Sequence, residues 1–194
     1  MRLSRRDVVR AGALGLAGLP GLPLLANESA GVGRPKARAK AVIFYHHYGA
    51  PSHIDTFDPK PAAPAEIRGE FATIHSSAPG MPVTDIMPGI AKVCDRLAVV
   101  HTMSHKTSNH NPGGRDHWPA CYSLVLAGAG VKRGYVHGES DRSGEYPRGL
   151  SHTPGDMAAT LFWALGLDPQ THIHDPLGRP YALADGQPIT ALFD

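Results

Sequence analysis

Residues 40–61, KAVIFYHHYGAPSHIDTFDPKP, are the stretch that decides the fold. Its apolar part, residues 41–45, is followed by two histidines and then by Gly49 and Pro51. A short run of apolar, β-branched and aromatic residues that Gly and Pro stop is typical of a buried strand leading into a loop. We therefore predict a strand over residues 41–45.

The loop after this strand is rich in groups that bind metals or substrates. Its histidine and aspartate side chains are His46, His47, His53, Asp55 and Asp58. Ligand sites in α/β folds form where strands of the sheet end. A carboxylate at this point is thus a candidate ligand of a metal or a substrate. The alternative is structural, with a polar strand end and a turn at Asp58 before Pro59.

The composition is that of an ordinary globular protein with one unusual feature. The chain has 194 residues, of which 42% are hydrophobic and 19% charged, so we expect one domain at most. Its 22 glycines and 18 prolines predict many loops and few long elements. The 12 histidines are several times the usual share, and neutral imidazole is a common metal ligand. The composition therefore favours metal binding.

Charge and cysteine content narrow the class of protein further. The formal charge is +2, but residues 1–26 hold four arginines and one aspartate, so the remainder has a formal charge of −1. A chain this close to neutrality has no electrostatic attraction for nucleic acid. Cys94 and Cys121 are too few for a disulfide framework; they either pair or are buried thiols, and we favour buried thiols.

Residues 1–30 have the features of an export signal and are left out of the predicted fold. Residues 4–7, SRRD, resemble the twin-arginine motif and precede an uncharged apolar run over residues 11–26. This run contains two prolines and is too short to span a bilayer comfortably, so we expect no stable transmembrane anchor. We predict delivery by the twin-arginine export machinery to a periplasmic or extracytoplasmic location, with residues 31–40 as a linker. The alternative is an amphipathic or membrane-anchoring N-terminus.

Two more strands are predicted, and histidines follow the first of them. LAVVH at residues 97–101 and CYSLVLA at residues 121–127 are short apolar runs of the kind that form buried strands. The loop after residue 101 contains His105 and His110, so two successive strand-to-loop units each supply histidines. His172 and His174 are two residues apart, as side chains on one face of a strand are, so a strand is also expected there.

Asp116 and His117 are adjacent in the loop sequence GGRDHWP. An Asp-His pair on a loop can bind one metal ion or be divided between two ions a few ångströms apart. The alternative is a turn that carries a surface histidine.

Residues 153–165 predict the clearest helix of the chain. Thr153 can cap its start, Pro154 suits its first turn and Gly166 ends it. A shorter helix is predicted over residues 87–96, where apolar residues recur at helical spacing.

Several of these stretches resemble one known family. They are the twin-arginine start, GAPSHIDTFDPKP at 49–61, AEIRGEF at 65–71, NHNP at 109–112, GRDHWP at 114–119, and LGLDP through GRPYALADGQPI at 165–189. Together they resemble the sulfatase-like exported proteins grouped as the domain-of-unknown-function family numbered 1501. That family is similar to the alkaline phosphatase superfamily, whose members hydrolyse phosphate or sulfate esters with metal ions and a nucleophile. The resemblance implies an α/β fold, with a sulfatase-like sheet, flanking helices and long loops.

The resemblance also implies roles for four residues. Asp55 would be the carboxylate after the first strand that binds metal, and Asp116 and His117 would be later ligands of metal or substrate. The cofactor implied is a divalent ion, Zn²⁺, Ca²⁺ or Mg²⁺, and the substrate is a sulfated or phosphorylated ester. His110 is the catalytic candidate, because it occupies the position where sulfatases hold a Cys or Ser nucleophile before a proline. This histidine departs from the sulfatase pattern.

A second departure is a gap. His110 and Asp116 are six positions apart, whereas longer relatives carry an extended segment here that includes a DEFGR-type strand end. The chain therefore resembles an N-terminal piece, residues 41–112, joined to a C-terminal piece, residues 113–194. Together they would form one truncated sulfatase-like domain over residues 41–194. We expect an exported sulfatase-like protein whose ancestral ester hydrolysis is impaired; the alternative is a non-catalytic remnant that binds a metal ion or a sulfated glycan.

Overall fold

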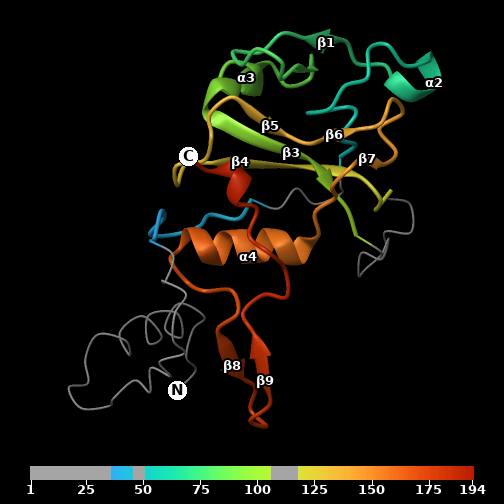
Figure 1. Ribbon diagram of the computed structural model, residues 1–194. Coiled ribbons are helices and arrows are strands. Elements are labelled where there is room, and N and C mark those ends of the chain that lie inside the picture. Colours follow the sequence, from blue (N-terminus) through green and yellow to red (C-terminus); the bar gives the residue numbers. More distant parts are fainter. Residues whose placement is uncertain (1–35, 46–50, 106–117) are drawn as a thin grey trace, which may run out of the picture. The chain divides into compact units, whose positions relative to one another are not determined.

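The computed structural model describes residues 36–45, 51–105 and 118–194 (Figure 1). The chain divides into residues 1–33 and a compact unit of residues 34–194, and the described residues belong to the second unit. This unit combines helices with several small sheets, so the fold is of mixed α and β character.

Strand β3, Leu97–Met103, is the centre of the largest sheet within the described ranges (Figure 1). It pairs in antiparallel orientation with β4, Tyr122–Ala127. On its other edge it pairs in parallel orientation with β5, Tyr135–His137. Every residue of β3 after Leu97 is buried, because neighbouring strands occupy both edges and other elements cover both faces.

The two faces of this sheet pack into two hydrophobic clusters, because successive side chains of a strand point to opposite faces. The cluster on one face includes Ala98, Val100, Met103, Met157, Ala164, Ile189, Leu192 and Phe193. The cluster on the other face includes Ala78, Met81, Val83, Ala91, Cys94 and Val99. Helix α4 therefore covers one side of β3, and the segment of residues 78–94 covers the other (Figure 1).

Helix α4, Pro154–Ala164, confirms the helix predicted over residues 153–165. Thr153 caps it: its hydroxyl accepts a hydrogen bond from the Asp156 backbone N–H, and the Asp156 carboxylate accepts one from the Thr153 N–H. This reciprocal pair satisfies backbone donors that the first turn of a helix otherwise leaves unpaired. Gly166 follows the helix with a φ of 79°, a left-handed conformation that ends helices and favours glycine.

The remaining elements are short. The hairpin-like pairs are β1 with β2, Thr73–Ile74 and Val83–Thr84; β6 with β7, Glu139–Ser140 and Pro147–Arg148; and β8 with β9, His172–His174 and Pro180–Ala182. The short helices are α2, Ala65–Arg68, and α3, Pro88–Ala91, with 3₁₀ turns η1, Cys94–Arg96, and η2, Thr190–Leu192.

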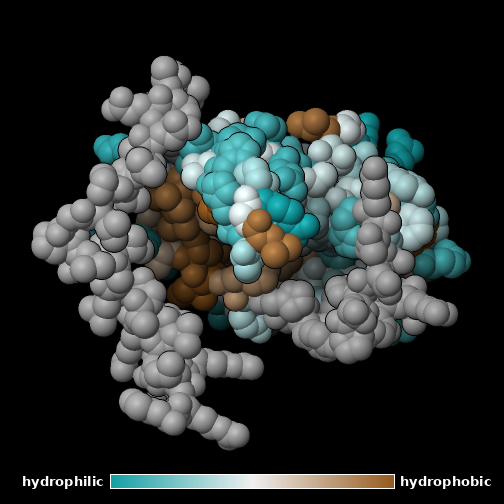
Figure 2. Space-filling model, turned by 90° about the horizontal axis from the view of Figure 1, so that it is seen from below, coloured by the Kyte–Doolittle hydropathy of each residue, from teal (hydrophilic) through white to brown (hydrophobic). Residues whose placement is uncertain are grey.

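The strand predicted over residues 41–45 is wrong. These residues form no strand of any sheet in the described part of the chain, and all of them are exposed. Ile43 is 96% exposed and Phe44 70% exposed. A strand needs a neighbour to pair with, and no strand of the described sheets pairs with this segment. Figure 2 shows that hydrophobic residues do reach the surface on the face that it views.

Residues 36–39, expected to lie in a linker, instead contact the end of α4. The backbone N–H groups of Arg38 and Ala39 both donate to the carbonyl of Ala164, at 2.7 and 2.8 Å. The Arg38 guanidinium lies over the rings of Trp163 and Phe193, 5.3 and 5.4 Å from their centroids. Cations near the C-terminal end of a helix are favourable because unpaired carbonyls carry partial negative charge there.

Other elements were predicted in part. The strands at 97–101 and 121–127 are confirmed as β3 and β4, and the alternating histidines lie on β8. The single helix expected over residues 87–96 is instead α3 followed by the 3₁₀ turn η1. Cys94 and Cys121 are free and buried, as favoured. Among the helices that the structure describes, none is long and apolar enough to cross a membrane.

Candidate functional site

Of the four residues predicted to form the site, the structure describes one. Asp55 lies in the loop that precedes α2, and His110, Asp116 and His117 lie outside the described residues. Their predicted proximity to Asp55 therefore stays a prediction. His46 and His47 also lie outside the described ranges.

Asp55 is held by both its backbone and its side chain. Its carbonyl accepts a hydrogen bond from the Thr84 hydroxyl at 2.5 Å, which ties the loop to β2. Its carboxylate packs against Gly69, where a Cβ atom would lie 2.7 Å from Oδ1. Gly69 has a φ of 72°, so a glycine serves this position for two reasons: the backbone conformation and the space that the carboxylate occupies.

No group of three or more His, Cys, Asp or Glu side chains in the described ranges is arranged to hold a metal ion. Asp55 supplies a single carboxylate, whereas hard divalent ions such as Ca²⁺ and Mg²⁺ need several oxygen ligands. The described residues therefore do not by themselves form a complete metal site.

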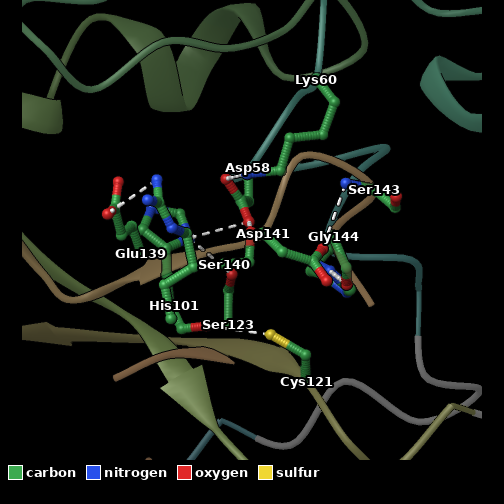
Figure 3. Close-up of polar contacts among 12 residues, drawn as sticks. Asp58, Lys60, His101, Cys121, Ser123, Glu139, Ser140, Asp141, Ser143 and Gly144 are labelled. Atoms are coloured by element: carbon green, nitrogen blue, oxygen red, sulfur yellow. Dashed lines mark hydrogen bonds and ion pairs between the residues drawn. The ribbon is translucent and has the colours of Figure 1, made fainter. Parts of the chain in front are cut away.

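A second group of polar side chains does come together, around Asp58 (Figure 3). We call it the Asp58 cluster; its members are Asp58, Lys60, His101, Ser123 and Ser140. The Lys60 ammonium lies 2.8 Å from Asp58 Oδ1, and the Ser140 hydroxyl donates to Asp58 Oδ2. These side chains are largely buried, with Asp58 12% and Lys60 16% exposed. A buried carboxylate needs such partners, because removing a charge from water is costly.

His101 joins this cluster from β3. Its Nδ1 atom lies 3.7 Å from Asp58 Oδ2 and is hydrogen-bonded to the Ser123 hydroxyl at 3.0 Å. Its backbone carbonyl accepts a hydrogen bond from the Cys121 thiol at 3.3 Å. Because Ser123 is on β4, the imidazole spans two neighbouring strands at the point where the loop of Asp58 crosses them (Figure 3).

A neighbouring contact fixes the first part of the same loop. The imidazole Nε2 of His53 is hydrogen-bonded to the carbonyl of Gly144 at 2.8 Å. Gly144 belongs to a turn in which the Asp141 carboxylate accepts bonds from the N–H groups of Ser143 and Glu145, at 3.1 and 2.8 Å. The loop after residue 50 is therefore bound to the β6–β7 region at two points, His53 and Asp58.

Electrostatics favour neutral imidazoles here. Burial lowers the pKa of His101, although the carboxylate of Asp58 partly opposes this. Burial likewise lowers the pKa of His53, again opposed by Asp58. The lowered pKa values favour the neutral imidazole both for His101 in the cluster and for His53 beside it. This arrangement can hold the loop in place, but its side chains are too buried to face a large substrate.

Sequence reasoning found part of this cluster. Asp58 was among the candidate residues, and His101 was recognised as the end of a strand, but Lys60, Ser123 and Ser140 were missed. A polar residue that follows four apolar ones in a buried strand is the signal that marks His101. The serines carry no such signal, because single serines are frequent on strands and turns.

Comparison with protein families identifies the chain. The family described as "Protein of unknown function (DUF1501)" matches residues 39–114 and 111–193. The chain belongs to the DUF1501 family. No curated protein and no solved structure matches it.

The two DUF1501 matches meet in the Asp58 cluster. Asp58, Lys60 and His101 belong to the first matched segment, and Ser123 and Ser140 to the second. Strand β3 likewise comes from the first segment, whereas both of its neighbours come from the second. The two parts of the DUF1501 match therefore form one sheet and one polar cluster.

Proposed function

We propose that this chain is a shortened, exported member of the DUF1501 family in which the hydrolysis of sulfate or phosphate esters is impaired. Its ancestry would be that of the sulfatase-like, metal-dependent hydrolases of the alkaline phosphatase superfamily. The remaining function would be the binding of a divalent metal ion or a sulfated ligand by the histidine- and aspartate-rich loops.

The observation that carries this proposal is the exposure of residues 41–45. Their sequence is that of a buried strand, yet Val42, Ile43 and Phe44 are 41%, 96% and 70% exposed. Exposing such a run costs about 25 cal/mol for each Å² of apolar surface left in water. Loss of a part of the sheet would leave such a run with strand composition but no strand to pair with.

The two-part family match supports the same proposal. The family matches the chain in two separate segments, which overlap only at residues 111–114. A natural deletion or a gene-assembly error between these segments would produce this pattern. Sequencing the genomic DNA around the codons for residues 110–116 tests this directly. A continuous reading frame that encodes only the short chain would support a natural deletion, and a longer frame would support a gene-assembly error.

Metal binding is proposed for Asp55 together with Asp116 and His117. A bound divalent ion would polarise the ester and stabilise charge on the leaving oxygen. Within this chain, Asp55 would supply a carboxylate that packs against Gly69, while the Thr84 hydroxyl holds the Asp55 backbone carbonyl. His110 would remain the candidate for contact with the reacting group.

The experiment is a comparison of metal content and turnover in the full chain and two variants. Asp55→Asn removes the proposed ligand, and Asp85→Asn changes an exposed aspartate next to Thr84, the residue that binds the Asp55 backbone. We expect a lower content of bound Zn²⁺, Ca²⁺ or Mg²⁺ in Asp55→Asn only, and hydrolysis of aryl sulfate and aryl phosphate at background in all three proteins. Metal-dependent turnover well above background, lost in Asp55→Asn, would show an intact hydrolase and overturn the proposal.

A sulfated polysaccharide column separates the two binding alternatives. Retention of the full chain that persists in chelator would favour the glycan. A chain that is not retained on the column and contains no bound metal would rule out both forms of binding.

A further inference from the structure

His137 and His152 form a pair of imidazoles away from the Asp58 cluster. Their Nε2 atoms are 2.9 Å apart, and their ring centroids are 5.0 Å apart. The rings thus meet through their nitrogen atoms at hydrogen-bond distance rather than by stacking. His137 is on β5, and His152 directly precedes the residue that caps α4.

The number of protons on this pair decides whether the contact is attractive. An imidazole nitrogen donates when protonated and accepts when bare, so one Nε2 must carry a proton and the other must not. A pair with one additional proton keeps this bond. When both rings are charged, both Nε2 atoms become donors, and two like charges face each other at 2.9 Å. The second protonation therefore converts a hydrogen bond into a repulsion.

The groups around the pair oppose that second charge on one side and favour it on the other. Around His137 are the Tyr135 hydroxyl, 3.3 Å from Nδ1, and Lys132, whose ammonium lies over the Tyr135 ring. Around His152 is Asp156. Burial, then His152 and Lys132, lower the pKa of His137, and burial lowers the pKa of His152 against the effect of Asp156.

The pair lies at a junction of several segments. The His152 N–H donates to the Thr102 carbonyl at 2.8 Å, and the Ser104 N–H donates to the His152 carbonyl at 2.7 Å. One turn further, the Asp156 carboxylate accepts a bond from the Gln187 N–H at 2.8 Å. A loss of order at His152 would thus affect the end of β3, the start of α4 and the segment that follows β9.

We propose that the His137–His152 hydrogen bond is an acid-sensitive latch that joins β5 to the start of helix α4. The bond is intact at neutral pH, when the pair carries at most one extra proton. It opens as the pH falls and both rings become charged, which releases the first turn of α4 from the sheet.

The sign of the effect follows from proton linkage. Both folded-state pKa values are below the ordinary histidine value of 6.5, so on acidification the folded state binds fewer protons than the unfolded state. The stabilisation by the pair is therefore present above pH 6.5 and is lost as the pH falls through the folded-state values.

Amide hydrogen exchange of the full chain between pH 7.5 and pH 5.0, in the presence of EDTA, tests this proposal. After correction for the intrinsic effect of pH, we expect exchange at the amides of Thr153, Gly155, Asp156 and Met157 to accelerate severalfold. Amides of Val99 and Val100, in the buried part of β3, should accelerate less. Uniform acceleration across the chain would overturn the proposal, because it would show global unfolding only.

Two variants and a control show whether the pair is responsible. His137→Gln and His152→Gln each leave at most one titratable ring, so both should abolish the extra acceleration at residues 153–157. His172→Gln removes an exposed histidine on β8 and should leave it unchanged. Persistence of the acid response in both pair variants would overturn the latch.

If a variant fails to fold, histidine nitrogen NMR of the unchanged protein still decides the question. We expect one ring of the pair to carry its proton on Nε2 at pH 7.5 and the other to have a bare Nε2. As the pH falls, both rings should become doubly protonated over the same pH range in which the amides at the start of α4 lose their protection from exchange. Two bare Nε2 atoms at pH 7.5 would overturn the latch. Amide protection that increases on addition of Zn²⁺ would also overturn it, because the pair would then be a metal site.

Discussion

Two apolar segments of similar composition, residues 41–45 and strand β3, have opposite environments. VIFY at residues 42–45 is exposed, whereas AVV at residues 98–100 is entirely buried. The difference lies in their neighbours: β3 has a strand on each edge and a hydrophobic cluster on each face. Apolar composition therefore makes a segment capable of being a strand, but only the rest of the chain determines whether it becomes one.

The largest effect is expected from a charge placed in each segment. Val99→Asp would bury an unpaired carboxylate in the hydrophobic cluster that contains Val83 and Cys94. We expect the free energy of unfolding to fall by more than about 4 kcal/mol, which would unfold the protein. Ile43→Asp should change the free energy of unfolding by less than about 0.5 kcal/mol, because the side chain is exposed. Urea unfolding followed by circular dichroism measures both. Equal losses would show that residues 41–45 are buried in solution.

A second pair of variants compares the loss of a buried carboxylate with the loss of an exposed one. Asp58→Ala leaves Lys60, Ser140 and His101 without their carboxylate, and we expect a loss of about 3 kcal/mol. Glu139→Ala, next to Ser140 in sequence, breaks an exposed ion pair with Arg148 and should cost at most about 1 kcal/mol. Unfolding midpoints in urea provide the measurement. A smaller effect of Asp58→Ala than of Glu139→Ala would mean that the cluster does not hold the loop on β3.

The cap of α4 tests the element that covers β3. Thr153→Ala removes the hydroxyl that accepts from the Asp156 N–H and should cost about 1 kcal/mol. Thr171→Ala changes an exposed threonine outside the helix and should have an effect within about 0.5 kcal/mol. Thermal unfolding of both variants is the check, and identical midpoints would contradict the capping role.

The smallest effect at neutral pH is expected from the histidine of β3 itself. Burial lowers the pKa of His101 below 6.5, so the stabilisation from its neutral form is present above pH 6.5 and is lost as the pH falls through the folded-state value. The unfolding midpoint should fall between pH 7.5 and 5, and His101→Gln should weaken that dependence. His75→Gln, at an exposed position, is the control. A pH dependence unaltered by His101→Gln would assign the effect to other histidines.

The elements that sequence reasoning predicted correctly carry their signals locally. Helix α4 has its own cap, proline and terminal glycine, and β3 and β4 are short apolar runs with clear ends. Strands β5, β6 and β7 were missed because residues 131–150 are polar and rich in glycine, and their strand character comes from pairing. The strand over residues 41–45 failed for the converse reason, since its local signal is strong and its neighbours are absent from the described sheets.

The site was predictable to a similar extent. The aspartate-rich loop was recognised as important, and it does bind the end of the central sheet through Asp58. Its partners Ser123 and Ser140 could not be inferred, because they come from separate strands distant in sequence, and short polar side chains have no periodicity. The His137–His152 pair was missed for the same reason, as each residue alone is an ordinary histidine.

The pairing order of β3 has a consequence for synthesis. Its partners β4 and β5 lie at residues 122–137, and the cluster on its α4 side needs residues 189–193. While the ribosome is still translating those residues, β3 emerges as an unpaired apolar segment, of the kind that chaperones bind. Contacts between such distant residues form slowly, because the chain between them must first be ordered. The sheet around β3 can therefore form only after residues 122–137 have left the ribosome.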